Sequence, residues 1–200
     1  MLEYICRFFR KVYKLLVAKY YKFTSMAYLH TPKLQFPSND YQVDGCKFKE
    51  SHCIYDGVDW GIHLGEDCNE KVSTQVRTIG RGKVVYSALH PGSEKKRNWG
   101  NIIIIAHKNP ATRKVFFSLY AHLGERHVLK GDSVELGDLI GFIGKSNTSE
   151  NGWWKDSHLH FAIYTGPWNG KVLPGYYKKR QHRTKLSDWK NPSDFIENYT

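Results

Sequence analysis

From about residue 57 onwards, short apolar runs alternate with turns that contain glycine, proline or asparagine. The runs are rich in β-branched and aromatic residues, which fit the pleated, half-buried surface of a strand. This pattern predicts a mainly β domain, a compact antiparallel sheet or barrel, over residues 57–175. We expect its strands at residues 81–86, 101–106, 115–121, 139–143 and 158–164. The strand at 158–164, which contains two histidines, is expected to be the last one of the domain.

Before this domain the pattern is different. In residues 1–25 apolar side chains recur at spacings of three and four, and basic residues fill much of the remainder, which predicts a basic amphipathic helix. Such a helix could lie on an anionic membrane surface, or its apolar stripe could pack on the domain, and the sequence leaves both open. Residues 26–56, with Pro32 and Pro37, read as an extended connector.

The C-terminal segment, residues 176–200, is polar and basic around Lys178–Arg180. The basic run predicts a solvated loop, and we expect the apolar pair Phe195–Ile196 near the end of the chain to dock on the domain.

Composition narrows the class of protein. The chain has 200 residues, of which 40% are hydrophobic, so it can bury a sizeable core and is not globally disordered. Its net charge of +11 favours polyanions: nucleic acid, anionic lipid or an acidic wall polymer. We expect no transmembrane helix, because no apolar run reaches the necessary length, and no cleavable signal, because arginines and lysines interrupt the first apolar residues.

The four cysteines do not decide the redox compartment. No C-x-x-C pair is present, so a zinc finger or a thioredoxin-type site is not indicated. Cys46 and Cys53 could form a disulfide in an oxidising compartment, or both could be free and buried.

The candidate chemistry lies in three groups of histidines. In H-L-H, residues 158–160, the two imidazoles share one face of a strand, because side chains alternate with period two. His63 and Asp67 flank Gly65, which favours a turn that brings both side chains to one point, and His122 follows an apolar strand. Four histidines and one carboxylate exceed the three ligands that a catalytic zinc needs, so the remainder could act as bases or stabilise an oxyanion.

Taken in order, these motifs resemble the M23 zinc metallopeptidases of the LytM and lysostaphin type. The resemblance runs over about residues 57–165 and rests on H-x-G-x-D at 63–67, Y-A-H-L at 120–123, the glycine-rich stretch 130–144 and H-L-H-F at 158–161. Each motif alone is weak, whereas all four in this order are highly specific. The resemblance implies a LytM-type β domain with a groove across its sheet, and endopeptidase activity on peptidoglycan cross-links or glycine-rich wall peptides.

The resemblance also implies a role for each residue. His63, Asp67 and His160 would bind Zn²⁺ with water as the fourth ligand, and His122 with His158 would form the catalytic pair. The residues by themselves do not divide ligands from catalysts.

Several neighbours of these motifs carry alternatives. Trp153 and Trp154 lie in a longer segment than is usual before H-L-H-F, and they could form a wall of the substrate groove or cover the core. Glu66 is expected to point away from the metal, and Cys68 to be a buried structural cysteine. The other histidines are expected to be surface or core polar groups: His30, His52, His90, His107, His127 and His182.

The sequence thus predicts a zinc-dependent endopeptidase of peptidoglycan peptides, acting in the cell envelope or outside the cell by the family resemblance. Two alternatives remain: a metallopeptidase for a non-wall peptide, and a non-catalytic module that binds the wall or activates another hydrolase. A nucleic-acid binder is disfavoured, because no recognition motif accompanies the positive charge.

Overall fold

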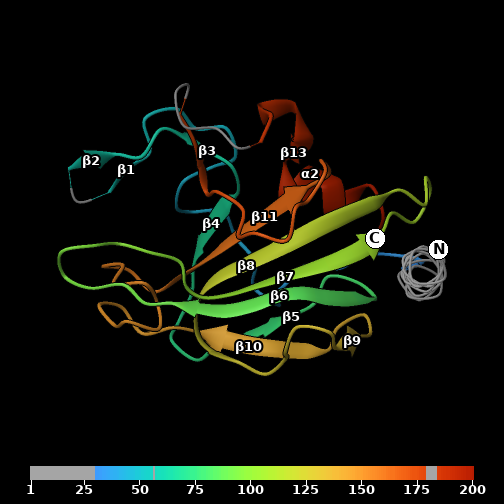
Figure 1. Ribbon diagram of the computed structural model, residues 1–200, viewed down its shortest axis with the longest axis horizontal. Coiled ribbons are helices and arrows are strands. Elements are labelled where there is room, and N and C mark those ends of the chain that lie inside the picture. The colour runs from blue at the N-terminus through green and yellow to red at the C-terminus, as the bar shows by residue number, and fades with distance from the viewer. Residues whose placement is uncertain (1–29, 56, 179–183) are drawn as a thin grey trace, which may run out of the picture.

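The computed structural model describes residues 30–55, 57–178 and 184–200. The expected helix over residues 1–25, with its proposed membrane contact, and His182 lie outside these ranges. Within them the chain forms one nine-stranded antiparallel sheet and two small two-stranded sheets (Figure 1). The elements in chain order are β1 (Ile54–Tyr55), β2 (Val58–Asp59), β3 (Ile62–His63), β4 (Glu66–Asn69), β5 (Gln75–Arg77), β6 (Gly82–His90), β7 (Gly100–Lys108), β8 (Val115–Arg126), β9 (Ser133–Val134), β10 (Leu139–Ile143), β11 (His158–Tyr164), β12 (Tyr176–Tyr177), η1 (Leu186–Asp188), β13 (Trp189–Lys190) and α2 (Pro192–Glu197).

The expectation of a mainly β antiparallel fold is confirmed, and all five predicted strands are present. The long strands lie in the order β11-β8-β7-β6, with β4 paired to β11 and β10 paired to both β5 and β8. The isoleucine run of β7 shows how the sheet is stabilised, because its residues are fully buried on both faces. Ile103 and Ile105 pack in one hydrophobic cluster, and Ile102 and Ile104 pack in another.

The strand containing H-L-H-F is not the last strand, contrary to expectation. The short strands β12 and β13 follow it, and β13 pairs with β11 through Ile163↔Lys190 and Tyr164↔Trp189. Neither short strand could be predicted from the sequence, because two residues are too few to show alternation.

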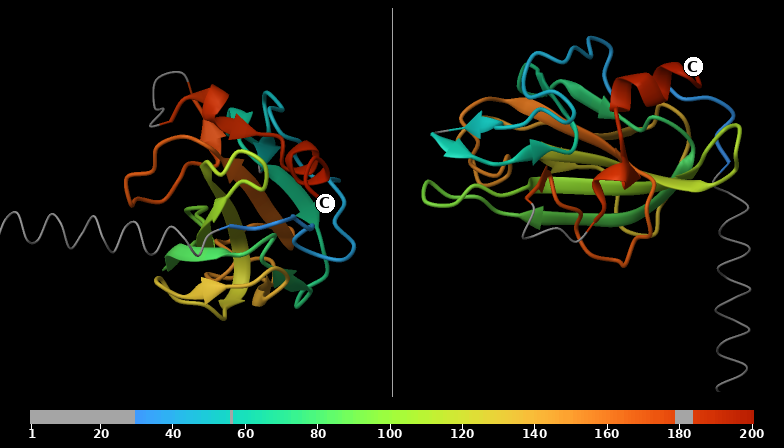
Figure 2. Two further views of the ribbon diagram at one scale, coloured as in Figure 1. Left: turned by 90° about the vertical axis from the view of Figure 1, so that its right-hand side faces the viewer. Right: turned by 90° about the horizontal axis from the view of Figure 1, so that it is seen from above.

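The C-terminal helix α2 packs against one side of the sheet (Figure 2). Asn191 caps its N-terminus by accepting a hydrogen bond from the Asp194 amide at 3.2 Å, and Pro192 occupies the first turn. Ile196 is fully buried in the core, and Phe195 packs beside it. The apolar pair therefore docks on the domain as expected.

The segment before the first strand also packs on this core. Leu34 is buried, and its amide donates to the carbonyl of Tyr199, so the two ends of the described chain are joined. Among the described residues, no helix is both long enough and apolar enough to cross a membrane.

Candidate metal centre and active site

Strand pairing brings the first and last motifs together. In the register of β4 with β11, Asp67 lies opposite His160, and paired residues of antiparallel strands project to the same face. A bend at Leu64–Gly65 between β3 and β4 places His63 on the same site. Gly65 is required there, because a Cβ at this position would lie 3.0 Å from the His160 ring and 2.5 Å from the Phe161 carbonyl oxygen.

Three potential metal-ligand atoms form a nearly regular triangle. His63 Nε2 lies 3.2 Å from Asp67 Oδ1, His160 Nδ1 lies 2.9 Å from Asp67 Oδ1, and the two nitrogens are 3.0 Å apart. Tetrahedral zinc with bonds of about 2.0–2.1 Å separates its ligand atoms by about 3.3 Å. All three side chains are buried. The two nitrogens and one oxygen therefore fit a zinc ion in both chemistry and spacing.

The hydrogen bonds made by the side-chain atoms that face away from the triangle support this interpretation. His63 donates from Nδ1 to the Lys47 carbonyl at 3.2 Å, so its Nε2 lone pair is directed to the triangle. Asp67 accepts a hydrogen bond from the Tyr55 hydroxyl at 2.9 Å on its other oxygen, Oδ2. Such outer partners orient the ligands of protein metal sites. His160 Nε2 is buried without a hydrogen-bond partner, so ring packing against Trp99 and the close approach of Gly65 hold that ring.

The protonation states follow from burial and from mutual attraction. Burial alone would raise the pKa of Asp67, but the adjacent His63 and His160 rings hold it well below its ordinary value. Burial favours the neutral form of His63, yet the Asp67 carboxylate outweighs it and raises the pKa of His63. Burial lowers the pKa of His160 to about 4, so this ring is neutral at neutral pH. An ionised carboxylate beside a neutral imidazole is the form in which both bind a metal.

His122 and His158 lie next to this triangle. Their ring centroids are 4.7 Å apart, and the His122 ring lies 6.0 Å from that of His160. Each is oriented by a backbone carbonyl: His122 Nδ1 bonds the Asn151 carbonyl at 3.1 Å, and His158 Nδ1 bonds the Asp156 carbonyl at 2.9 Å. Both Nε2 atoms are thereby left with a lone pair. Burial holds the pKa of His122 well below its usual value.

A bulge in β8 directs His122 into the site. Ala121 pairs with His160 and faces the same side, so regular alternation would send His122 to the opposite face. His122 instead adopts a left-handed φ of 65°, and Leu123 returns to the core cluster that holds Tyr120. Bulges of this kind redirect a side chain beside an active site.

Aromatic side chains line the approach to the metal centre. A cavity of about 190 Å³ adjoins His122 and His160, and four other aromatic residues line it: Trp60, Trp99, Trp154 and Tyr176. Trp154 is buried and donates from Nε1 to the Asn98 carbonyl at 2.8 Å. Trp153, half-buried with a φ of 66°, is not among the residues that line this cavity.

Sequence reasoning missed four of the residues around this site. Trp60, Trp99 and Tyr176 come from separate loops and short strands, and Tyr55 lies upstream of the first motif. No local signal distinguishes them from core aromatics, because only the fold brings them together.

The remaining sequence expectations have clear structural outcomes. Glu66 points away from the triangle and is buried, where it accepts hydrogen bonds from Tyr41 and Ser193, and burial raises its pKa. Cys68 is a free, buried cysteine. His107 is a core residue, whose ring bonds the Arg81 carbonyl and the Ser118 hydroxyl.

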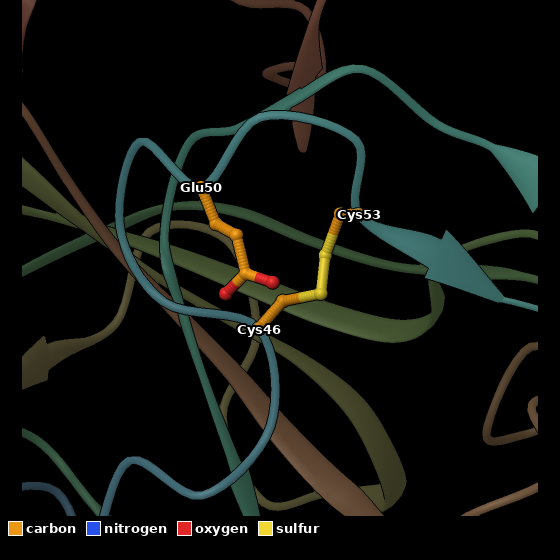
Figure 3. A group of neighbouring side chains, drawn as sticks. All are labelled: Cys46, Glu50 and Cys53. Carbon is orange, nitrogen blue, oxygen red and sulfur yellow. A yellow bond between two sulfur atoms is a disulfide. The ribbon is translucent and has the colours of Figure 1, made fainter.

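A second group of potential ligands, Cys46, Glu50 and Cys53, lies close to β3 (Figure 3). The two sulfurs are joined in a disulfide with a Cα–Cα distance of 6.2 Å, which settles the alternative that the sequence left open. The bonded sulfurs are not thiolates, so this group does not present a metal site in the disulfide form.

Comparison with known proteins agrees with this geometry. The family model for peptidase family M23 matches residues 61–173, more than half of the chain. The chain belongs to peptidase family M23. The matched range includes all three residues of the candidate metal triangle and the two neighbouring histidines.

Individual relatives of this M23 family member are distant. The peptidoglycan DD-endopeptidase ShyA of Vibrio cholerae is 32% identical over 101 residues, which make up 50% of this chain and 20% of that protein. The curated relatives are matched over only 18% to 28% of their own lengths.

Solved structures support the fold. The catalytic domain of the antimicrobial peptidase lysostaphin from Staphylococcus simulans aligns with a TM-score of 0.50 at 23% identity, over 76% of this chain and 90% of that one. A zinc-containing peptidase from Vibrio cholerae aligns with a TM-score of 0.50 at 26% identity, over 66% of this chain and 37% of that one.

Proposed function

We propose that this M23 family member is a zinc endopeptidase that hydrolyses the peptide cross-links of bacterial peptidoglycan. The observation that carries the proposal is the buried triangle of His63, Asp67 and His160, with two further histidines beside it. The peptidoglycan substrate is supported by the relative ShyA, whose name states that activity. The net charge of +11 suits an anionic wall and a site of action in the cell envelope.

Zinc held by His63, Asp67 and His160 would lower the pKa of a bound water and polarise the scissile carbonyl. The chain supplies the proton transfers. His158 and His122 each carry a lone pair on Nε2, because Nδ1 donates to a backbone carbonyl. One Nε2 accepts the proton of the attacking water and returns it to the leaving amine, and the other, when protonated, donates to the developing oxyanion.

The aromatic cavity is the proposed substrate groove. Trp154 forms part of its wall, and Trp60 and Trp99 extend it. Trp153, the other tryptophan that the sequence suggested for this wall, does not line the cavity and is not part of the proposed groove. Flat rings accept an extended peptide backbone while they exclude water from the scissile bond.

The decisive experiment is a digest of purified, cross-linked peptidoglycan with the zinc-loaded protein, read by mass spectrometry of the released fragments. We expect new peptide termini with the parent chain and none with His160→Ala. Glu66→Gln is the matched control, because Glu66 neighbours a ligand in sequence but points away from the metal. Zinc binding without cleavage of any wall preparation would refute the wall substrate and favour a non-wall peptide.

A further inference from the structure

A loop is closed by the Cys46–Cys53 disulfide (Figure 3). Backbone hydrogen bonds join this loop to His63 and Asp67, two of the candidate metal ligands. We call residues 46–53 the disulfide loop. Only its two cysteines are buried, and Phe48 is half-buried, whereas the other five residues are exposed. The loop therefore has few apolar contacts of its own to hold it in place.

Three hydrogen bonds connect the disulfide loop to His63. The Lys47 carbonyl accepts from His63 Nδ1 at 3.2 Å, which fixes the tautomer that directs Nε2 to the metal. The amide of Lys49 donates to the His63 carbonyl at 2.9 Å, and the His63 amide donates to the Glu50 carbonyl at 3.0 Å. Both the ring and the backbone of this ligand thus depend on the loop.

Asp67 is held from the two ends of the loop. Its amide donates to the Cys46 carbonyl at 2.9 Å, and its carbonyl accepts from the Gly45 amide at 3.0 Å. On the other side of the crosslink, the Tyr55 hydroxyl donates to Asp67 Oδ2 at 2.9 Å and itself accepts from the Cys46 backbone.

The conformation of the loop is not one that the chain adopts readily. Lys49 and His52 both have a left-handed φ, of 60° and 61°, although neither is glycine. Each such residue costs free energy that the surroundings must offset. Apart from the two cysteines, Phe48 is the apolar side chain that the loop packs against the core, and the crosslink adds a covalent constraint that limits the loop's alternative conformations.

We propose that the Cys46–Cys53 disulfide is a positioning element for the metal centre, so that its reduction weakens zinc binding at His63, Asp67 and His160. The inference rests on the proposed function for the identity of the metal. Loss of an outer-shell partner commonly lowers metal affinity by about 10- to 100-fold. We expect a decrease of this size, which would make the activity dependent on an oxidising environment.

The reduction can be carried out on the folded chain with a phosphine, which brings no thiol to compete for zinc. The phosphorus gives two electrons to the disulfide, one water molecule supplies two protons to the sulfurs, and its oxygen leaves as the phosphine oxide. The products are the two thiols of Cys46 and Cys53. Cys46, at 9% exposure, is the more exposed of the two cysteines.

The test compares zinc affinity in four samples: the parent chain and the Cys46→Ser/Cys53→Ser variant, each with and without phosphine. Affinity is measured by competition with a zinc chelator, and folding by circular dichroism of the metal-free proteins. We expect a loss of about 10- to 100-fold in the reduced parent and in both variant samples. Reoxidation should restore the parent, and phosphine should not change the variant, which keeps the free Cys68.

The possible outcomes are distinct. Equal zinc affinity in the oxidised parent and in the Cys46→Ser/Cys53→Ser variant, which has no thiols beside Glu50 to bind zinc, overturns the positioning inference but leaves the proposed function intact. Failure of the oxidised parent to bind zinc overturns the proposed function itself. Unfolding of both the reduced parent and the variant overturns the inference in favour of a general structural role, because the affinity loss would then not be specific to the metal centre.

Discussion

At the scale of single residues, the site depends on which nitrogen of each imidazole is protonated. Backbone carbonyls accept from Nδ1 of His63, His122 and His158, so the chain itself selects the tautomer in which Nε2 carries the lone pair. His160 is the exception, since its Nδ1 lies in the metal triangle. The tautomer alone does not divide ligands from proton carriers, because the candidate ligand His63 shares it with His122 and His158, so replacing single residues has to make that division.

Replacing His122 by alanine should leave zinc in place but remove activity. The three triangle residues are untouched, so the variant should retain stoichiometric zinc, whereas cleavage should slow by about 100-fold or more because a general acid–base group is lost. His158→Ala should behave in the same way. Zinc content by elemental analysis, measured beside cleavage rate, checks this assignment. Loss of zinc in either variant would place that residue among the ligands.

His107 provides a residue-scale prediction about pH. Burial lowers its pKa to about 4, whereas in the unfolded chain it has an ordinary value near 6.5. Below pH 6.5 the unfolded state therefore binds a proton that the folded state does not, and stability falls as the pH drops towards 4. The loss attributable to this group reaches about 3 kcal/mol.

The measurement is urea unfolding of the parent chain and of His107→Asn between pH 7 and pH 4.5. Asparagine cannot titrate and retains a donor for the Arg81 carbonyl. We expect the free energy of unfolding to fall more steeply with decreasing pH in the parent. Parallel pH profiles would show that His107 does not titrate on unfolding.

At the scale of elements, the site is assembled where regular strands are interrupted. The bend between β3 and β4 lets His63 and Asp67 reach one point, and the bulge in β8 turns His122 to the same face. The rest of β8 and β11 alternates regularly and carries the core. The irregular backbone of the bend and the bulge thus positions the residues of the candidate site, and the regular strands carry the core residues.

Gly65→Ala tests the bend. The new methyl group would lie 3.0 Å from the His160 ring and 2.5 Å from backbone, so the ring or strand β11 must move. We expect zinc affinity to fall by at least about 10-fold and stability to fall by about 1–3 kcal/mol. Gly131→Ala is the comparison: its φ of 105° strains alanine, but no atom lies within 4 Å of the added Cβ, so it should lower stability without changing zinc affinity. Unchanged zinc binding in Gly65→Ala would contradict the close approach.

At the scale of the whole molecule, the segments outside the matched family region complete the core. Leu34 from the N-terminal side and Ile196 from α2 are buried in the same cluster as the central strands. The Leu34 amide also bonds the Tyr199 carbonyl at 2.8 Å. Residues far from the active site in sequence therefore stabilise the sheet on which it is built.

Ile196→Ala should destabilise the whole fold. Removing a fully buried isoleucine side chain leaves a cavity and costs about 2–5 kcal/mol of unfolding free energy. Glu197→Ala, at an exposed neighbouring position, should change stability by less than about 0.5 kcal/mol. Chemical denaturation of both variants measures the difference. Equal stability would show that α2 is not part of the cooperative core.

The sequence by itself determined the long strands and nominated the five residues of the candidate site. Alternation of apolar residues predicts the local backbone conformation, and the residue type alone shows whether a side chain can bind a metal. Both can therefore be predicted without knowledge of the fold. The very short strands β12 and β13 were not predicted, because two residues are too few to show a periodic pattern. The disulfide partners were visible, but their oxidation state was not.

Only the tertiary structure decided which side chains meet. Regular alternation would place His122 on the wrong face, and the bulge that corrects this is set by pairing across the whole sheet. Trp60 and Trp99 reach the cavity from separate segments, and the disulfide loop reaches His63 through backbone atoms that carry no sequence signature. These features depend on the packing free energy of the complete sheet, which no local pattern contains.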